Sequence, residues 1–175
     1  MIEIRFAGFG GQGVLTTGMV CATAGMNLGK NVTWYPSYGS QMRGGTANCS
    51  VKFDDKAIAS PYLRNTDILV AMNTPSIDMF MGEMKPGAVL FVDAGTVPDD
   101  YAYRKDIKVV KVPVNEIAAK VGNPRGANLV MLGAMAAHTD IFTIDEIKEA
   151  VTYFFKKKGI ENPKNMDCLI EGSTC

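Results

Sequence analysis

The chain has 175 residues, of which 47% are hydrophobic and 21% are charged, and its formal net charge is zero. A chain of this length can bury a hydrophobic core as one domain. The composition excludes a disordered chain, and the balanced charge gives no electrostatic reason to expect nucleic acid as a partner.

The sequence shows no signal for membrane insertion or for secretion. The longest weakly polar run, at 127–137, is too short to span a bilayer. The N-terminus enters a strand-like pattern at once, so we expect no signal peptide and no membrane association. No C-x-x-C pair occurs, which leaves zinc and iron–sulfur ligand sets unsupported. We expect free thiols at all four cysteines, namely Cys21, Cys49, Cys168 and Cys175.

The first third of the chain alternates strand and helix patterns around two glycine-rich stretches. Periodicity and turn residues predict these elements in chain order. They are a strand at 2–7, a helix at 14–28 with Gly29 as C-cap, a strand at 32–35 stopped by Pro36, a loop at 36–46 and a strand at 47–53.

The rest of the chain continues the alternation and ends in a polar tail. Strands are expected at 67–72, 89–93 and 109–114. Helices are expected at 75–84 with Thr74 as N-cap, at 115–121, at 128–139 (apolar all round), and from a capping box at Thr143 and Glu146 to Lys158, closed by Gly159. We expect the tail from about residue 160 to be loosely ordered.

Alternating strands and helices predict a three-layer α/β/α domain with a mostly parallel sheet. Between 32 and 53 a strand follows a strand with no helix between them, which favours a mixed sheet. No linker or internal repeat divides the chain, so we expect a single domain over 1–175.

Gly8-x-Gly10-x-x-Gly13 lies where a dinucleotide fingerprint should lie, between the first strand and the first helix. Glycines there permit a tight turn and a close backbone approach, and the helix N-terminus offers N–H donors to an anion. The alternative is that these glycines serve only the packing of the helix on the sheet.

A nicotinamide site also needs an acidic residue after the second strand to hold the ribose. No Asp or Glu occurs between Glu3 and Asp54, so the sequence disfavours a lone NAD(P)-binding oxidoreductase. The same region is suited to an anionic ligand, because against Glu3 it carries four cations, Arg5, Lys30, Arg43 and Lys52.

Other catalytic signatures are missing. No Walker lysine follows the glycines, no G-x-S-x-G motif occurs, and the only histidine, His138, follows an apolar helix and is expected to be structural. We therefore expect no catalytic and no metal-binding residue.

In the second loop, Arg43 beside Gly44 and Gly45 could present a guanidinium to a carboxylate or phosphate, or form only a surface turn.

The pairing of Gly8–Gly13 with Tyr38-Gly39-x-x-x-Arg43-Gly44-Gly45 resembles the gamma subunits of 2-oxoacid:ferredoxin oxidoreductases of the 2-oxoglutarate, pyruvate and ketoisovalerate type. The likeness covers the chain to about residue 155. Three later blocks follow in the same order, Ile58-Ala59-Ser60-Pro61, Asn73-x-Pro75 and Asn128-x-x-x-Leu132-Gly133. Ser40-Gln41 stands where many relatives have Pro-Glu, so no role of that acid carries over.

The resemblance implies the fold of the gamma domain of pyruvate:ferredoxin oxidoreductase and a role in oxidative decarboxylation. A 2-oxoacid, with 2-oxoglutarate favoured, and coenzyme A would give an acyl-CoA and carbon dioxide, with electrons passing to ferredoxin. Thiamine diphosphate, magnesium and iron–sulfur clusters would belong to alpha, beta and delta partner subunits, so this chain would be inactive alone and could dimerise when isolated. A cytoplasmic location and anaerobic metabolism also follow from the resemblance.

The resemblance further implies that this chain helps to form the coenzyme A pocket. The candidate residues are the backbone donors Gly10, Gly11, Gln12 and Gly13, then Tyr38, Arg43, Gly44 and Asn48 from the second loop, and Arg125 and Asn128 at the start of the apolar helix. Three alternatives stay open. The chain could be the beta subunit of an indolepyruvate:ferredoxin oxidoreductase, a lone NAD(P)-binding oxidoreductase, or an assembly protein whose glycine loops touch only partners.

Overall fold

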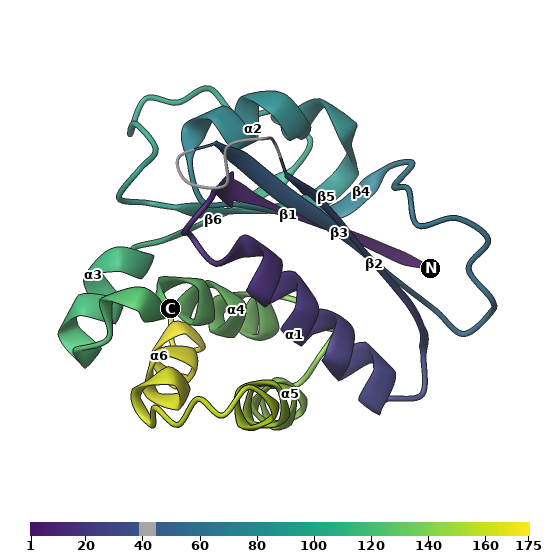
Figure 1. Cartoon of the computed structure of the whole chain (residues 1–175). Helices are drawn as coiled ribbons and strands as arrows, with labels where there is room; N and C mark the ends of the chain where they lie inside the picture. The colour runs from purple at the N-terminus through teal and green to yellow at the C-terminus, as the bar shows by residue number, and fades with distance from the viewer. Residues whose placement is uncertain (39–44) are drawn as a thin grey trace.

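The computed structural model describes residues 1–38 and 45–175. In this part of the chain six strands form one sheet, and helices lie on both of its faces (Figure 1). The strands are β1 (Ile2–Phe9), β2 (Asn31–Tyr38), β3 (Thr46–Asp54), β4 (Thr66–Ala71), β5 (Met84–Asp93) and β6 (Lys108–Val112). The helices are α1 (Val14–Asn27), α2 (Thr74–Phe80), α3 (Val114–Val121), α4 (Ala127–His138), α5 (Ile144–Lys157) and α6 (Lys164–Gly172), with short 3₁₀ turns η1 (Met81–Glu83) and η2 (Pro124–Gly126).

The sheet is mixed, with strand order β2-β3-β1-β4-β5-β6. β1, β4, β5 and β6 run parallel, whereas β3 is antiparallel to both β1 and β2. The antiparallel pairs arise because β2 is followed by β3 with no helix between them to carry the chain back. In Figure 1, α2 lies on one face, and α1, α3, α4, α5 and α6 lie on the other. The predicted three-layer α/β fold with a mixed sheet is confirmed.

The larger core fills the space between the sheet and helices α1, α4 and α5. Every residue of α4 from Ala127 to Ala136 is buried, as its all-round apolar sequence predicts. Met131, Leu132 and Met135 are fully enclosed, and burying each such side chain stabilises the fold by roughly 1.5–3 kcal/mol. No helix in the described ranges is long and apolar enough to cross a bilayer.

Two glycines let α1 lie directly on β3. A Cβ atom added to Gly18 would overlap the sulfur of Cys49, and one added to Gly25 would overlap the ring of Phe53. This close approach fixes the height of α1 above the sheet. It therefore also fixes where the N-terminus of α1 meets the end of β1.

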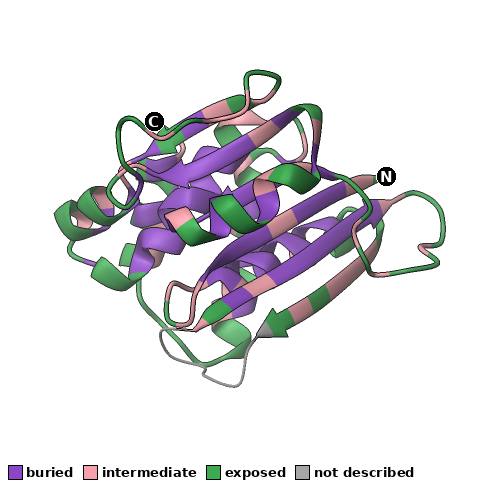
Figure 2. Cartoon of the chain, turned by 90° about the horizontal axis from the view of Figure 1, so that it is seen from above, coloured by how far each residue is buried: buried purple, intermediate pink, exposed green. Residues whose placement is uncertain are grey.

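The expectation that Pro36 stops the second strand is wrong. β2 continues through Pro36, which pairs in register with Cys49, to Tyr38. The reason is that β2 is the edge strand, and one side of an edge strand needs no backbone donors. Figure 2 shows this strand more exposed than its neighbours. The predicted loop at 36–46 therefore loses its first three residues to the strand, and 39–44 lie outside the described residues.

The middle of the chain differs from the prediction at α2 and at the start of β5. The N-cap of α2 is Asn73 rather than Thr74, because the Asn73 carbonyl oxygen accepts a hydrogen bond from the Ser76 N–H. The helix ends at Phe80, and β5 already begins at Met84.

The expectation of a loosely ordered tail is wrong as well. Residues 164–172 form α6, which packs on α4 and buries Cys168 and Leu169 completely. The few apolar residues of α6 lie on one face, and burying that face is enough to hold this nine-residue helix against the rest of the fold. The capping box of Thr143 and Glu146 at the start of α5 is confirmed.

Candidate functional site

The glycine loop joins the end of β1 to the start of α1 at the carboxyl edge of the parallel strands. Gly11 and Gly13 have φ angles of 104° and 74°, which side-chain-bearing residues rarely adopt. Next to this loop, β4 leads to α2 on the opposite face of the sheet (Figure 1). The point between β1 and β4, where helices leave to opposite faces, is the usual place for a ligand in open α/β sheets.

The side chain of Gln12 fills the crevice between these two strand ends. Its carbonyl oxygen accepts hydrogen bonds from the Phe9 N–H at 2.6 Å and from the Asn73 amide at 2.9 Å. Its own amide donates to the Met72 carbonyl at 2.9 Å. A ligand therefore cannot enter this crevice as the pyrophosphate of a dinucleotide would, and must approach the outer side of the loop.

The backbone donors of the loop divide into two groups. Those of Gly10 and Gln12 are used internally, by the carbonyls of Gly45 and Phe9. Within the described residues, the N–H groups of Gly11 and Gly13 have no hydrogen-bond acceptor. The first turn of α1 adds further N–H groups without helical partners, because the first bond of the helix is made by Thr17. Two of the four predicted backbone donors thus have no acceptor among residues 1–38 and 45–175.

A pocket of about 250 Å³ lies on the outer side of the loop. Its walls are backbone and small or apolar side chains, so it suits a thin, partly apolar group that can reach the free N–H donors. The lining residues are Phe9, Gly10, Gly11, Gly13, Val14, Leu15, Thr16 and Ala47.

A second pocket of about 320 Å³ shares Gly13 and Thr16 with the first and is much more polar. Four asparagines and one arginine line it, namely Asn123, Arg125, Asn128, Asn162 and Asn165. The predicted site residues Arg125 and Asn128 are therefore brought to the glycine loop. Arg125 is exposed and forms no ion pair within the described chain, so its guanidinium is available to an anion.

Asn128 holds the start of α1 in place. Its amide lies 3.4 Å from the Gly13 carbonyl and 3.3 Å from the Thr17 hydroxyl. A Cβ atom on Gly13 would come within 2.7 Å of the same amide. The glycine at position 13 is thus required both by its φ angle and by the approach of α4.

The structure does not bring Asn48 to this site. Its side chain lies on the α2 face of the sheet, where its carbonyl oxygen accepts a hydrogen bond from Arg5 at 3.0 Å. Tyr38 ends β2 in register with Ala47, which does line the first pocket. Arg43 and Gly44 lie outside the described residues.

The three described cations from the first third of the chain are each paired with a carboxylate, so they offer no unpaired positive charge to a ligand. Arg5 pairs with Glu83 at 2.9 Å, Lys30 with Asp55 at 2.6 Å, and Lys52 with Glu3 at 3.1 Å. Two of these acids lie outside the segment that the charge count covered, and none of the three cations lines either pocket.

Two polar residues at strand ends were missed by the sequence reasoning. Asn73 connects α2 to Gln12, as described above. Asp93 is fully buried at the end of β5, where its carboxylate accepts hydrogen bonds from the Gly95 N–H at 3.0 Å and the Asn115 amide at 2.6 Å. Burial raises the pKa of Asp93 above its ordinary value. The available signal was a polar residue directly after a buried strand.

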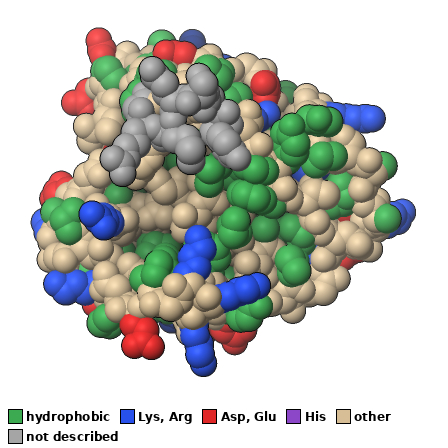
Figure 3. Space-filling model, viewed as in Figure 1, with side chains coloured by type: hydrophobic (Ala, Val, Ile, Leu, Met, Phe, Trp, Pro, Cys, Tyr) green, Lys and Arg blue, Asp and Glu red, His purple; other side chains and the backbone are tan. Residues whose placement is uncertain are grey.

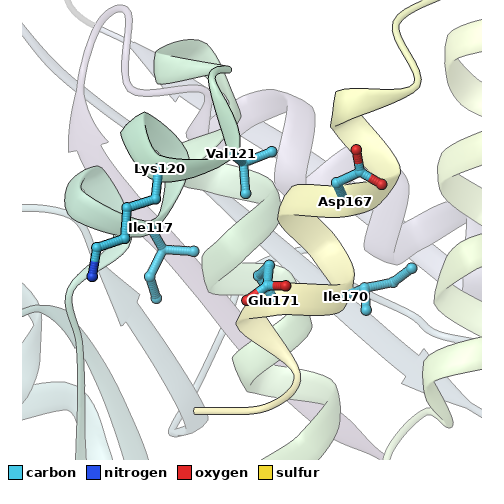
Figure 4. Close-up of a pocket in the computed structure, with 6 residues that line it drawn as sticks. All are labelled: Ile117, Lys120, Val121, Asp167, Ile170 and Glu171. Atoms are coloured by element: carbon cyan, nitrogen blue, oxygen red, sulfur yellow. The ribbon is translucent and has the colours of Figure 1, made fainter.

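A larger pocket, about 530 Å³, lies between α3 and α6 (Figure 4). Isoleucine and valine side chains from the two helices face it, with charged side chains at its rim; its lining is Ile117, Lys120, Val121, Asp167, Ile170 and Glu171. It has no set of free backbone donors and is not part of the glycine-loop site.

The cysteines and the histidine do not gather into a site. Cys21, Cys49 and Cys168 are buried and Cys175 is exposed, all as free thiols. The His138 ring contacts the Cys175 carbonyl at 2.9 Å, which fits the expected structural role. Among the described residues, no three His, Cys, Asp or Glu side chains are close enough to hold a metal ion.

A family model for pyruvate ferredoxin/flavodoxin oxidoreductases matches residues 3–175 of the chain. The chain is 38% identical over 159 residues to the ketoisovalerate oxidoreductase subunit VorA of Methanothermobacter marburgensis, a match that covers 90% of this chain and 33% of VorA. It is 33% identical over 151 residues to the 2-oxoglutarate synthase subunit KorC of Methanocaldococcus jannaschii, which covers 85% of this chain and 81% of KorC.

Among solved structures, the chain resembles the gamma subunit of a keto/oxoacid ferredoxin oxidoreductase from Geobacter sulfurreducens. The TM-score is 0.81 at 29% identity, and the match covers 98% of this chain and 96% of that one. The chain thus spans about a third of the length of VorA and most of the length of KorC and of the Geobacter subunit.

Proposed function

The chain belongs to the pyruvate ferredoxin/flavodoxin oxidoreductase family, and we propose that it works as the gamma subunit of a 2-oxoacid:ferredoxin oxidoreductase. The observation that carries the proposal is the family match over 3–175, together with a glycine loop in which two backbone donors beside Arg125 have no acceptor in the described part of the chain. The reaction would be the oxidative decarboxylation of a 2-oxoacid with coenzyme A to an acyl-CoA and carbon dioxide, with the electrons passing to ferredoxin.

In this proposal the chain supplies binding groups and partner subunits supply the redox chemistry. Thiamine diphosphate on a partner subunit would supply the electron sink for the decarboxylation. The described residues do not fit a diphosphate–magnesium site or an iron–sulfur cluster, since they hold no cluster of ligating side chains and three of the four cysteines are buried and scattered. These groups would therefore belong to alpha, beta and delta subunits, and this chain would be inactive by itself.

Coenzyme A fits the two joined pockets by its chemistry. It carries phosphate groups, amide groups and an adenine ring. The free N–H groups of Gly11 and Gly13 at the positive end of α1 suit a phosphate oxygen. The Arg125 guanidinium suits a second phosphate, and the asparagine amides of the polar pocket suit the edge of a base or a pantetheine amide. We propose Arg125 and Asn128, with the loop, as this chain's part of the coenzyme A site, and Arg43 and Gly44 as contributors from the second loop.

The 2-oxoacid itself is less closely defined. The relatives named above act on ketoisovalerate and on 2-oxoglutarate, and the family model carries the name of pyruvate. The sequence-based preference for 2-oxoglutarate therefore stands as one of three candidates. The groups that select the substrate are proposed to lie on partner subunits, because the pockets of this chain suit a long anionic cofactor better than a small dianion.

The proposal places the chain in the cytoplasm, in a complex with its alpha, beta and delta partners, and reaching ferredoxin only through them. The test is anaerobic isolation of the tagged chain from its host, followed by mass spectrometry of its partners and an assay with three 2-oxoacids. We expect thiamine-dependent partner subunits and coenzyme A-dependent reduction of ferredoxin. A chain that is isolated alone and binds a nicotinamide nucleotide would contradict the proposal.

The coenzyme A assignment is tested in the isolated complex. Arg125→Gln should raise the KM for coenzyme A roughly tenfold, because one charge-assisted contact to phosphate is lost, while the KM for the 2-oxoacid stays unchanged. Lys120→Gln, an exposed cation at the pocket between α3 and α6, is the matched control and should change neither value. Equal effects of the two variants would contradict the assignment.

A further inference from the structure

α1 is a largely buried helix whose last residues reach the surface. Its sequence, VLTTGMVCATAGMN, contains no charged residue in 14 positions, and only Met26 and Asn27 are exposed. The side of α1 that is not covered by the sheet therefore offers apolar and uncharged side chains. Figure 3 shows hydrophobic side chains gathered along this helix, with Lys and Arg side chains next to them.

A hollow of about 490 Å³ lies where α1 packs against α5. Met19, Thr23 and Met26 are spaced so that they lie along one side of α1, and Met26 keeps 66% of its surface exposed. From α5, Tyr153 faces the same hollow and is 55% exposed. Methionine and tyrosine are residues that protein interfaces use to bury apolar surface.

The charged side chains that line this hollow are both cations, and Asn27 is an uncharged polar neighbour. Lys157 and Lys158 line the hollow, and Lys156 precedes them on the same helix end. Lys157 lies over the Tyr153 ring at 5.9 Å and Lys158 over the Phe154 ring at 4.4 Å. Neither lysine is within ion-pair distance of a carboxylate, and the hollow has no acidic lining residue in the described chain.

An apolar floor with an unpaired cationic rim is complementary to one kind of occupant. We propose that the hollow between α1 and α5 is a docking site for an acidic segment of another protein, one that inserts apolar side chains between Met26 and Tyr153. Its carboxylates pair with Lys157 and Lys158, which raises the association rate and fixes the orientation. The flat surface of an anionic membrane would contact the lysines but would not fill the hollow.

This site does not depend on the proposed enzyme activity. The glycine-loop pockets are lined by Gly11, Arg125 and their neighbours, whereas the hollow lies farther along α1 and shares no lining residue with them. Failure of the docking proposal would leave the coenzyme A site untouched, and the converse also holds.

The experiment is site-specific photocrosslinking of the full-length chain in its host, with a benzophenone amino acid in place of Met26 or Tyr153. Met79, which is 54% exposed on α2 at the opposite face of the sheet, gives the matched control. We expect both test positions to crosslink the same segment of another protein, and that segment to carry an excess of Asp and Glu. The control position should not crosslink it.

Charge variants test the role of the rim. Replacing both Lys157 and Lys158 by Glu should lower the crosslink yield roughly tenfold, and replacing both by Gln roughly threefold, as expected for two partly exposed ion pairs. The double Gln variant removes the charges without reversing them, so it controls for any loss of helix stability in the double Glu variant. Circular dichroism checks that both variants remain folded.

A purified-component assay separates the possible occupants. Fluorescence anisotropy of a labelled peptide that alternates Glu with Leu and Met should show binding, and the peptide with Lys in place of Glu should not bind. Crosslinks only to a second copy of this chain, binding only to phosphatidylserine vesicles, crosslinks to a segment without acidic excess, or insensitivity to the charge variants would each overturn the proposal.

Discussion

Gln12 and Asn73 meet across the ends of two neighbouring parallel strands. The Asn73 amide donates to the Gln12 carbonyl oxygen at 2.9 Å, and the Asn73 carbonyl oxygen caps α2 by accepting from the Ser76 N–H at 2.9 Å. One asparagine therefore connects the glycine loop before α1 to the first turn of α2. The loop that carries the candidate site is thus held by the other face of the sheet.

Mutations of Asn73 can separate its two hydrogen bonds, the one to Gln12 and the one that caps α2. Asn73→Asp keeps the capping oxygen but loses the donor to Gln12, so we expect a loss of about 1 kcal/mol in the free energy of unfolding. Asn73→Ala loses both and should cost about 2–3 kcal/mol. Urea denaturation measures the two values. An Asn73→Asp variant as stable as the wild type would mean that the contact with Gln12 contributes nothing, whereas equal losses in the two variants would mean that the cap contributes nothing.

Gly13 tests the contact between the glycine loop and α4. Gly13→Ala places a Cβ atom at a φ of 74° and within 2.7 Å of the Asn128 amide, so we expect a loss of about 2–4 kcal/mol in stability. Gly29→Ala has nearly the same φ, 72°, with nothing near the new atom, and should lose only about 1 kcal/mol. The difference between the variants in thermal unfolding measures the contact with Asn128.

A second variant shows whether that contact is the cause. In an Asn128→Ala background the added methyl group has more room, so the cost of Gly13→Ala should fall toward that of Gly29→Ala. Additive losses would place the strain in the backbone alone.

The sequence predicted the alternating elements and the mixed sheet because strand and helix periodicity, glycine caps and one capping box are local signals. It failed where a tertiary position decides. Pro36 is compatible with a strand only because β2 lies at the sheet edge, which no local pattern reveals. In the same way, the tail becomes a helix because α4 offers it a surface.

The candidate site was predictable in its backbone and less so in its side chains. Glycine spacing located the loop, and Arg125 and Asn128 do lie beside it. Asn48 was misplaced because neighbouring residues of a strand point to opposite faces, and Ala47 rather than Asn48 faces the loop. The charge count failed because ion pairs join residues far apart in the sequence.

The ion pair of Glu3 and Lys52 is buried in the sheet, with both side chains no more than 6% exposed. Burial alone would raise the pKa of Glu3, but the N–H groups of Arg64 and Asn65 and the Lys52 ammonium outweigh it, so the pKa lies below its ordinary value. A lowered pKa contributes stability at pH values above the ordinary pKa, and this contribution is lost as the pH falls through the folded-state pKa.

Glu3→Gln should therefore destabilise the protein at neutral pH and flatten the acid limb of its stability profile. We expect a loss of about 3–5 kcal/mol, because Lys52 would remain buried without a counter-charge. Lys85→Gln, which breaks a half-exposed pair with Asp67, is the control and should cost less than about 1 kcal/mol. Urea denaturation from pH 3 to pH 8 measures both; a profile for Glu3→Gln parallel to that of the wild type would contradict the assignment.

The contribution of Asp93 to the free energy of unfolding should change with pH in the opposite direction to that of Glu3. Burial is the main cause of its raised pKa, so the folded state holds this proton more tightly than the unfolded state does. The stability that this carboxyl group contributes is fully present at pH values below its pKa in the unfolded state. It is lost as the pH rises through its pKa in the folded state. Asp93→Asn removes this dependence but offers one acceptor oxygen to two donors that reach separate oxygens, so we expect a loss of about 1–2 kcal/mol at neutral pH.

Asp93→Ala is the matched variant for the hydrogen bonds. It leaves the Gly95 N–H and the Asn115 amide without their acceptor in a buried place, and should cost about 2–3 kcal/mol at any pH. If Asp93→Asn were as unstable as Asp93→Ala, a carboxylate with both of its acceptor oxygens would be required.

The packing of α6 on α4 depends on two glycines, which let the backbones of the two helices come close together. A Cβ atom on Gly133 would overlap the Leu169 carbonyl, and one on Gly172 would overlap the Val130 carbonyl. Backbone cannot move aside as a flexible side chain can. We therefore expect each Gly→Ala variant to cost about 2–3 kcal/mol and to raise hydrogen exchange throughout 164–172.

Gly82→Ala is the control for both, because a Cβ atom there meets nothing within 4 Å and its φ is not positive. It should leave stability unchanged or raise it by up to about 1 kcal/mol. If Gly133→Ala behaved like Gly82→Ala, α6 would not be seated on α4, and the tail would be loosely held as its polar sequence predicts. A selective loss in Gly133→Ala and Gly172→Ala would instead show that helix contact, and not local composition, orders the end of the chain.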